Sequence, residues 1–379
     1  MIEYFFILSI LLIIHAYFGY PLSLCVVSLF KKRNIIKSVN SNLYNVTIII
    51  AAYNADKLIK DKIDNILNID YPKNMLQVIV ASDGSTDKTN DIVLEYAAKG
   101  IELLPLHRRG GKEIAQMEAI KQAKGEILVF TDVGTMLDPL GIKQIASNFC
   151  DPSVGCVSGE DRLIEKDGKS SGEGFYVRYE MWLRKLESRV NSLVGLSGSF
   201  FAARSIVCRN FSKNDDSDFH TLLSSIKMGL RGISDPLAIG YYNDISDQKL
   251  EYERKVRTVL RGITGFFNNI EYLNIIRYGM FSYQYFCHKL LRWLVPAFLM
   301  FEFLLVIILS DTSSIYLFIL IIQLFVLSVF VLLKIGIISS VPRLLYLPIY
   351  FITVNLSICV AWFKYLRHER IVTWNPSER

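Results

Sequence analysis

Four long apolar segments limit this chain to folds that place part of it in a lipid bilayer. The first runs from Tyr4 to Phe30, and the others are Trp293–Leu309, Ile315–Leu333 and Leu344–Phe363. A helix of about 20 apolar residues crosses the hydrocarbon core of a membrane. The chain is 51% hydrophobic, which is typical of a protein with such segments. We therefore expect one N-terminal membrane helix and about three C-terminal ones around a polar middle region.

The charges beside these segments predict their orientation. The first segment lacks a basic start and a small-residue cleavage site, so we interpret it as a retained anchor. Lys31, Lys32 and Arg33 follow it, and the positive-inside rule places that end in the cytoplasm. The N-terminus should then face outward, and the middle region should lie in the cytoplasm at the inner membrane of a bacterial cell.

Two rules conflict at the other end of the chain. If all three C-terminal segments cross, the tail lies outside, whereas the basic residues of the stretch from Lys364 to Arg379 favour the cytoplasm. We expect three true spans and an outward tail because the last segment is long enough to cross. The alternative is that Leu344–Phe363, which contains Pro348, lies in the membrane interface without crossing.

Composition excludes several other classes of protein. A net charge of +6 over 379 residues gives no indication of nucleic-acid binding. The six cysteines form no CxxC pair, which favours a reducing compartment without structural disulfides. The five histidines lack the spacing of metal ligands.

Strand and helix patterns alternate in the first half of the middle region. Short apolar runs typical of buried strands alternate with segments of helical spacing. The predicted strands are Val46–Ala52, Gln77–Ala81, Ile101–Pro105 and Ile127–Phe130, and the predicted helices are Lys57–Leu67, Lys88–Ala98 and Glu113–Ala123. This alternation predicts an α/β domain with a mainly parallel sheet and right-handed crossovers.

Polar residues follow every one of these strands. Ligands bind at the carboxyl edge of such sheets, and acids with basic residues there suit a nucleotide diphosphate and its metal. The residues at the four strand ends are Tyr53 and Asn54; Asp83, Ser85 and Asp87; Arg108, Arg109 and Lys112; and Thr131 and Asp132. Each has a simpler interpretation: Asp83 in a turn, Asp87 or Asp132 as a cap, and the basic loop as a solvated surface. Their combination favours the ligand site.

These segments resemble the family 2 glycosyltransferases, inverting enzymes of the GT-A fold that include cellulose, chitin and hyaluronan synthases. The matching motifs are TIIIAAYNA, VASDGSTDKT, RRGGK and VFTDVGT, in the family's order. The resemblance implies a nucleotide-sugar donor, with a UDP-sugar first in line, and Mg²⁺ or Mn²⁺. It assigns Tyr53 and Asp83 to the base, Lys112 to the diphosphate and Asp132 to the metal. Gly134 replaces the second acid of the usual D-x-D pattern, so Asp132 is the one metal ligand that carries over. The full predicted donor set is Ala52, Tyr53, Asn54, Asp83, Ser85, Asp87, Lys112, Thr131, Asp132, Arg254 and Arg257.

The resemblance continues into an acceptor loop and a catalytic base. Ser197, Gly198 and Ser199 match the family's acceptor-side loop. The family places a general base at the start of the next helix, Thr221–Met228, where Asp218 aligns best and Asp216 is the alternative. An inverting transfer needs one carboxylate to accept the proton of the attacking hydroxyl. An acid at a helix start is also a common N-cap.

Two further segments carry positive charge or aromatic side chains. Processive family members have a Q-x-x-R-W motif, for which this chain offers Arg254 and Arg257 with Thr258 in place of Trp, and a basic face on anionic lipid is the alternative. Within Gly172–Leu193, we expect the apolar stripe to pack against the sheet. Residues 263–292 are expected to form interfacial amphipathic helices.

The expected organisation is therefore an anchor (1–33), a cytoplasmic GT-A domain (44–262), interfacial helices (263–292), a membrane region (293–366) and a tail (367–379). We expect a glycosyltransferase acting on a lipid-linked or polysaccharide acceptor, with membrane lipids and no nucleic acid as partners. One alternative is a processive synthase that translocates its polymer. Another, from a different class, is a non-catalytic membrane binding or transport protein with a degenerate nucleotide fold.

Overall fold

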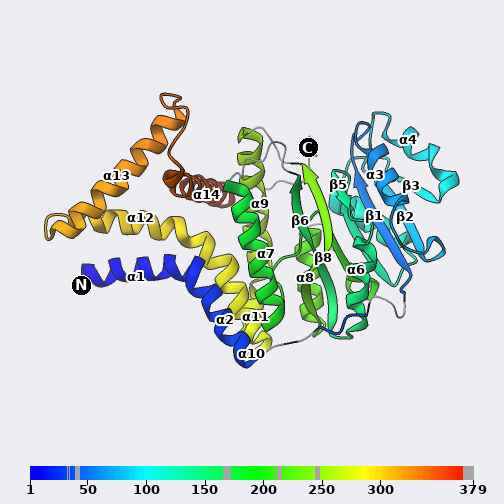
Figure 1. The fold of residues 1–379 in the computed structure, drawn as a ribbon, viewed down its shortest axis with the longest axis horizontal. Helices are drawn as coiled ribbons and strands as arrows, with labels where there is room; N and C mark the ends of the chain where they lie inside the picture. Colours follow the sequence, from blue (N-terminus) through cyan, green and yellow to red (C-terminus); the bar gives the residue numbers. More distant parts are fainter. Residues whose placement is uncertain are drawn as a thin grey trace.

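A computed structural model describes residues 1–31, 33, 35–38, 43–164, 172–209, 211, 216–243 and 248–369. Of the positions named above, Lys32 and residues 370–379 of the predicted tail lie outside these residues. So does part of the stretch between the predicted anchor and the predicted domain. In Figure 1 a sheet with its helices occupies one end of the molecule, and helices α1, α12 and α13 extend from the other. Helices α7 and α9 stand between these two parts.

The predicted strands are confirmed to within one or two residues. β1 (Val46–Ala52) lies between β2 (Leu76–Ser82) and β4 (Ile127–Asp132), and β3 (Ile101–Pro105) pairs with β2 at the edge. All of these pairs are parallel. Successive side chains of β1 enter opposite clusters, with Ile48 in one and Ile49 in the other. Both faces of the strand are therefore buried, which explains its unbroken apolar run.

The second half of the sheet is mixed. The strand order is β3-β2-β1-β4-β7-β6-β8-β5, and β7 (Phe200–Arg204) runs antiparallel to both β4 and β6 (Val154–Ile164). β8 (Arg231–Asn243) is parallel to β6 and contains the segment predicted as Pro236–Ile239, and β5 (Thr135–Leu137) closes the order. The GT-A-like α/β fold is thus confirmed, with antiparallel pairs that the alternation pattern did not indicate.

Helices cover both faces of the sheet. One face packs against α3 (Ile59–Leu67), α4 (Thr89–Glu95) and α6 (Gly141–Ser147), and the other packs against α5 (Lys112–Gln122) and α8 (Ser217–Lys227). These helices have the apolar spacing that buries one stripe of a helix against a sheet.

Two longer helices, α7 (Gly172–Val190) and α9 (Gln248–Asn268), join the sheet domain to the membrane helices. The stripe of α7 does not pack where we expected. Leu183 and Leu186 lie in one cluster with Tyr20 and Leu24 of the first apolar segment, so that segment takes the place predicted for the sheet. An apolar stripe in the sequence predicts that this face of the helix is buried, but it does not identify the element that buries it.

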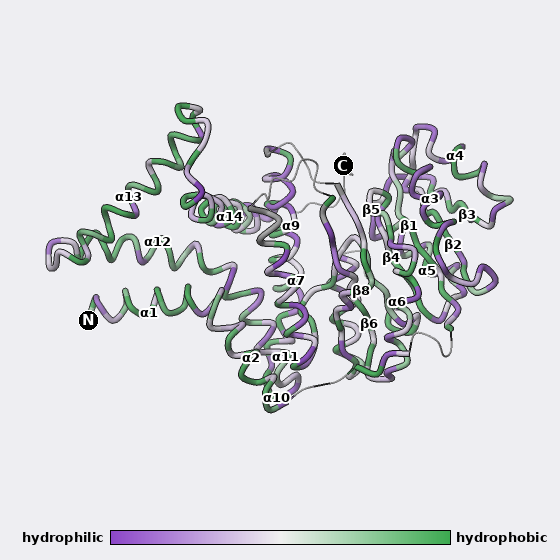
Figure 2. Tube along the Cα trace, in the orientation of Figure 1, coloured by the Kyte–Doolittle hydropathy of each residue, from purple (hydrophilic) through white to green (hydrophobic). Residues whose placement is uncertain are grey.

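Within the described residues, four helices are long and apolar enough to cross a membrane (Figure 2). The first comprises α1 (Ile2–Ile14) and α2 (Tyr20–Phe30), joined by a π-helical turn. The second starts at Met280 in α11 (Met280–Tyr285), just after α10 (Ile275–Tyr278), and continues through α12 (Arg292–Leu309). α13 (Ser314–Lys334) and α14 (Arg343–Leu366) are the third and fourth.

The fourth of these helices, α14, makes a long contact with α9. Phe267 of α9 stacks on Tyr365 of α14 and meets Trp362 edge-on, and Lys255 of α9 lies 4.7 Å from the ring centre of Tyr350. Earlier residues of α9 contact earlier residues of α14 and later ones contact later ones, so the contacts extend along much of both helices. α14 is foreshortened in Figure 1, whereas α1, α12 and α13 are seen from the side. α14 therefore lies along a charged helix of the sheet domain.

Candidate functional site

The carboxyl ends of β1, β2 and β4 meet at one edge of the sheet. Ala52 pairs with Ser82, and Ala51 pairs with Asp132. Because the three strands are parallel and in register, the loops that follow them begin side by side. The convergence of strand ends that the sequence predicted is present in the structure.

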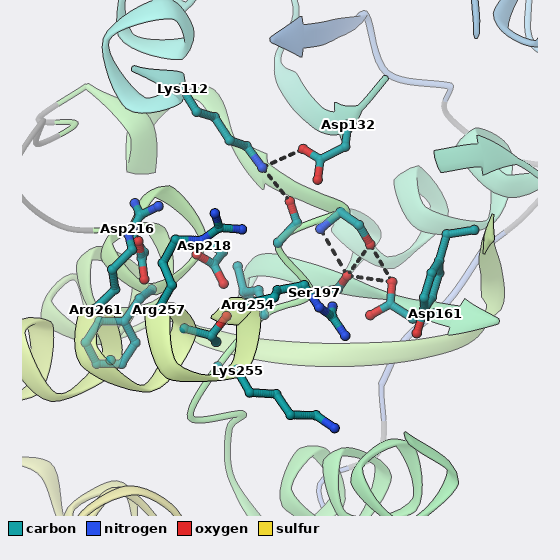
Figure 3. A pocket seen from close by; sticks show the side chains of 18 of the residues that line it. Lys112, Asp132, Asp161, Ser197, Asp216, Asp218, Arg254, Lys255, Arg257 and Arg261 are labelled. Carbon is teal, nitrogen blue, oxygen red and sulfur yellow. Dashed lines mark hydrogen bonds and ion pairs between the residues drawn. The ribbon is translucent and has the colours of Figure 1, made fainter. Parts of the chain in front are cut away.

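A cavity of about 1070 Å³ lies at this edge and extends to the membrane helices (Figure 3). Most of the predicted site residues line it: Tyr53, Asn54, Asp87, Lys112, Asp132, Ser197, Gly198, Ser199, Asp216, Asp218, Arg254 and Arg257. The others are not among the lining residues: Ala52, Asp83 and Thr131 are buried, and Ser85 is half-buried.

Lys112 connects three parts of the site. It is the first residue of α5, and its Nζ lies 2.5 Å from Oδ1 of Asp132 and donates a hydrogen bond of 2.9 Å to the carbonyl of Gly198. Burial alone would lower the pKa of Lys112, but the Asp132 carboxylate raises it above its usual value. The ammonium therefore stays charged and holds the end of β4 against the loop before β7.

Asp83 shapes the loop that presents Lys112. Its side chain is 2% exposed, and its two carboxylate oxygens accept the N–H groups of Gly110 (2.7 Å) and Gly111 (2.8 Å). The guanidinium of Arg109, in the same loop, stacks 3.9 Å from the ring centre of Tyr53. Contact of Asp83 with a nucleotide base stays a prediction, because this carboxylate is engaged within the protein.

Hydrogen bonds tie the first two strand-end loops together. Ser85 Oγ accepts the N–H of Asn54 (3.1 Å), and Asn54 Oδ1 accepts the N–H of Thr86 (2.9 Å). Asp87 accepts the N–H of Asp56 (3.0 Å) and that of Thr89, where α4 begins (3.0 Å). Asp87 thus has the helix-start contact of the capping interpretation and also faces the cavity.

A buried lysine lies directly under the end of β4. Lys62 of α3 is 0% exposed, and its Nζ donates to Thr131 Oγ1 (2.9 Å) and to the carbonyl of Thr135. Burial lowers the pKa of Lys62 to about 7, although Asp132 opposes this shift. A neutral amine has two N–H groups, which match these two acceptors. Lys62 therefore fixes both ends of the turn that carries Asp132.

The predicted acceptor loop is held by an acid that sequence reasoning missed. Asp161 Oδ1 accepts the hydroxyls of Ser197 (2.7 Å) and Ser199 (2.5 Å), and the N–H of Ser197 donates to Ser158 Oγ (2.8 Å). These bonds leave the backbone of Gly198 facing the cavity between the two serines. Asp161 itself lines the cavity beside them (Figure 3).

The two candidate bases have different surroundings. Arg261 of α9 pairs with both Asp216 and Glu113. Burial raises the pKa of Asp216 to about 7 although Arg261 lowers it, and Asp218 adds to the rise. Asp218 Oδ2 lies 3.7 Å from the point that a β-carbon on Gly198 would occupy. Asp216 is thus engaged by an arginine, whereas Asp218 faces the acceptor loop.

α9 supplies the cations on the opposite wall. Arg254, Arg257 and Arg261 recur at helical spacing on one face, and all three line the cavity (Figure 3). The sequence is compatible with a basic face that contacts either anionic lipid or a bound ligand. Its place on the cavity shared with Lys112 favours a ligand for these arginines.

Comparison with known proteins agrees with this geometry. Residues 47–206 match the model of glycosyl transferase family 2. The chain carries a family 2 glycosyltransferase domain. Its fold is similar to that of a mannosyltransferase from Pyrobaculum calidifontis solved with GDP-Man and Mn²⁺, with a TM-score of 0.73, 22% identity and coverage of 98% of this chain and 100% of that one.

The curated relatives match a smaller part of the chain. A poly-β-1,6-N-acetyl-D-glucosamine synthase of Staphylococcus epidermidis is 27% identical over 139 residues, which are 36% of this chain and 33% of that protein. Its counterpart from Staphylococcus aureus strain COL is 29% identical over 126 residues, 33% of this chain and 30% of that protein. The chain therefore matches about a third of the length of these relatives. The family match argues against the non-catalytic alternative.

The family 2 domain implies a divalent cation, and the residues present fit one that arrives with a diphosphate. Among the described residues no three His, Cys, Asp or Glu side chains gather into a metal site. Asp132 offers one carboxylate, 24% exposed in the cavity, with Lys112 as its ion-pair partner. Divalent cations in nucleotide sites are commonly held by one or two carboxylates together with the phosphates. Asp132 would supply the protein part of such a set.

Sequence reasoning missed Lys62, Asp161, Glu113 and Arg261. Lys62 interrupts the apolar stripe of Ile59, Ile63 and Ile66, and a lysine in such a stripe was the available signal. Asp161 lies within a strand, and no local pattern marks it. Glu113 and Arg261 are 148 residues apart, so their pairing depends on the tertiary fold.

Lys62 predicts a pH dependence of stability. Between a folded pKa of about 7 and an unfolded value of 10.5, the unfolded chain binds a proton that the folded chain does not. Stability should therefore rise with pH in this window, by at most about 1.4 kcal/mol per pH unit, and should not change through Lys62 below it. Thermal unfolding of the parent and of Lys62→Met across pH 7–9.5 measures this difference.

Lys60→Met, an exposed change on the same helix, is the matched control. The unfolding temperature of the parent minus that of Lys62→Met should increase as pH rises. The same difference taken with Lys60→Met should stay constant. Parallel profiles for all three proteins would show that Lys62 keeps its proton in the folded state.

Proposed function

We propose that this protein is an inverting glycosyltransferase that moves a sugar from a nucleotide-sugar donor to a lipid-linked or polysaccharide acceptor at the cytoplasmic membrane face. The observation that carries the proposal is the placement of Lys112 and Asp218 around one glycine. Lys112 bonds the Gly198 carbonyl, and Asp218 lies beside the same residue. A donor cation and a base thus lie close together on one cavity, as a single displacement requires.

The residues have distinct roles in this proposal. Lys112 and the α9 arginines would bind the donor diphosphate, and a divalent cation at Asp132 would neutralise its charge as it leaves. Asp218 would accept the proton of the attacking hydroxyl. Asp216 would instead hold Arg261, because a base must first be able to reach the proton that it removes. The loop held by Asp161 would position the acceptor, and a UDP-sugar is the first candidate donor.

A processive polysaccharide synthase is the second candidate. The names of the staphylococcal relatives favour it, whereas Thr258 stands where the processive motif has Trp. The length of the product distinguishes the two: a processive enzyme releases long chains at low turnover, and a single-addition enzyme extends each acceptor once.

The position of α14 supports a topology in which the other three apolar helices cross the membrane and α14 does not. One face of α14 packs on α9, and the opposite face exposes Leu356 and Phe363. Arg343 lies at one end and Lys364 at the other, so the positive-inside rule is met at both ends if α14 lies in the interface. This is the alternative that the charge conflict left open, and under it the stretch after α14 is cytoplasmic.

We predict that Asp218→Asn retains donor binding and lowers turnover by roughly 10²–10⁴-fold, since the amide cannot accept the proton. Release of nucleotide from a panel of UDP-, GDP- and dTDP-sugars, with a membrane extract as the acceptor source, measures turnover. Asp91→Asn, an exposed acid of α4, is the control and should match the parent. A dead Asp216→Asn beside an active Asp218→Asn would assign the base to Asp216.

We also predict that Asp132 carries the metal dependence. Mn²⁺ or Mg²⁺ should tighten binding of a nucleoside diphosphate to the parent, and EDTA should abolish this gain. In Asp132→Asn the affinity with metal should equal the affinity in EDTA, because the carboxylate ligand is lost. Calorimetric titration measures both. A variant that still binds more tightly with Mn²⁺ would place the ion elsewhere.

The topology is tested with single cysteines in a background without the native ones. Asp311→Cys, between α12 and α13, should react with a membrane-impermeant maleimide in intact cells, and Ile36→Cys should not. His368→Cys, just after α14, should also be protected. Labelling at His368 would mean that α14 crosses the membrane, and labelling at Ile36 would move the whole domain outside.

A further inference from the structure

The cavity does not end at the donor side. Its far end is lined by Tyr17 from the first membrane segment, by Arg184 of α7, by Lys289 and Trp293 from the second segment, and by Ile358 of α14. Three of the four candidate membrane helices therefore contribute to it. A molecule in this end of the cavity would contact both the family 2 domain and the lipid-facing helices.

Several charged groups at this end neutralise one another. Arg292 Nη1 lies 2.5 Å from Glu180, and His288 lies between Glu180 (3.3 Å) and Glu187 (2.6 Å). The hydroxyl of Tyr20 donates a 2.6 Å hydrogen bond to Glu187. The acids of this cluster are thus already engaged by an arginine, a histidine ring and a hydroxyl.

Two cations on the same wall have a different environment. Among the described residues, no carboxylate lies within 4.0 Å of Arg184 or Lys289. Lys289 Nζ faces the rings of Phe219 (5.6 Å) and Trp293 (5.9 Å), and Arg184 Nη1 donates to Ser158 Oγ (3.3 Å). Beyond that distance, Asp218 and Glu180 act electrostatically on Lys289, and Arg184 opposes them. Paired cations in a partly buried site favour an anionic ligand.

These cations lie apart from the donor site. Lys289 Nζ is 3.2 Å from the point that a β-carbon on Gly195 would occupy, at the start of the acceptor loop, whereas Lys112 bonds Gly198 near its other end. Asp218 interacts electrostatically with both lysines. The proposed base therefore lies between the donor cation and Lys289.

Lys289 also lies at a depth suited to a lipid headgroup. The second membrane segment has 30 residues and is about 45 Å long, more than a bilayer core of about 30 Å needs. Lys289 is the tenth residue of that segment, before its continuous apolar part, and Trp293 follows. Tryptophan is common at the membrane–water boundary, where lipid phosphates lie.

We propose that Arg184 and Lys289 bind the phosphate or diphosphate of a lipid-linked acceptor, with its hydrocarbon chain leaving between α14 and the first membrane segment. This inference rests on the proposed function and specifies its acceptor. The acceptor hydroxyl would then reach Asp218 from the side opposite the donor. A neutral polysaccharide would not require two cations here.

The test measures lipid binding apart from turnover. Full-length protein in phosphatidylcholine nanodiscs is titrated with radiolabelled undecaprenyl phosphate, with undecaprenol, and with inorganic diphosphate. The phosphorylated lipid should bind at least tenfold more tightly than undecaprenol, because only it reaches the cations. Diphosphate alone should compete weakly, because it lacks the chain. Equal binding of undecaprenol and its phosphate would overturn the proposal, and tight competition by diphosphate would show an anion site without a lipid.

Variants assign the binding to the two residues. Arg184→Gln and Lys289→Gln should each weaken binding of undecaprenyl phosphate by about 10- to 100-fold, as loss of a charge-assisted contact does. Lys289→Arg should restore most of the affinity, which shows that lost charge and not misfolding caused the defect. Arg189→Gln, an exposed change on α7, should bind as the parent does. Unchanged affinity in both glutamine variants overturns the proposal.

Donor binding separates this inference from the proposed function. If the parent binds a nucleoside diphosphate with Mn²⁺ but binds undecaprenyl phosphate no better than undecaprenol, the acceptor assignment fails and the glycosyltransferase proposal stands. If short neutral oligosaccharides accept sugar equally well in the parent and in Lys289→Gln, the acceptor is a polysaccharide. Absence of nucleotide binding in the parent would instead refute the proposed function.

Discussion

The ammonium group of Lys112 is the contact on which the site depends most. It joins the start of α5, the end of β4 and the loop before β7 through Asp132 and the Gly198 carbonyl. Gly198 is 86 residues from Lys112 in the sequence, so one side chain holds together elements that only the tertiary fold brings into contact. A bound diphosphate would give Lys112 a new anionic partner, and the cation that accompanies it would give Asp132 a new cationic one. Donor binding would then loosen the link to the acceptor loop, which would couple the donor and acceptor halves of the proposed site through one side chain.

The second constraint is the burial of charge around that contact. Burial of an isolated charge at Lys62, Asp216 or Arg261 would be costly in free energy, and this cost is reduced in a different way at each site. Lys62 tends towards its neutral form and satisfies two oxygens. Asp216 and Arg261 form an ion pair shared with Glu113. Rigid partners on every side keep the turn at Asp132 and the start of α8 fixed, which is what a site for displacement chemistry requires.

The sequence was sufficient for the parts of the fold that local patterns determine. β1 was predicted to the residue, because a strand buried on both faces has an unbroken apolar run between polar ends. The in-register strand ends then placed Asp132 and Lys112 near each other. Lys62, Asp161 and Arg261 were missed because each acts through partners at least 36 residues away. Lys62 alone of the three has a local signal, which is its place in an apolar helical stripe. Asp83 shows the opposite case, since a motif residue with an expected ligand role also holds the loop that carries Lys112.

Membrane topology also required tertiary contacts. Length and apolar content make α14 equivalent to the other three segments, whereas the basic residues at its two ends favour the membrane interface over a crossing. Its packing along α9 separates it from them, because α9 has four cations, Arg254, Lys255, Arg257 and Arg261, beside the cavity and would be costly to bury in hydrocarbon. A helix that covers such a cavity from the lipid side closes it to bulk water while leaving its edge open to the bilayer. Under the proposed function, that arrangement would favour substrates with one polar and one apolar end, and it would give the membrane helices a part in selecting the acceptor as well as in anchoring the domain.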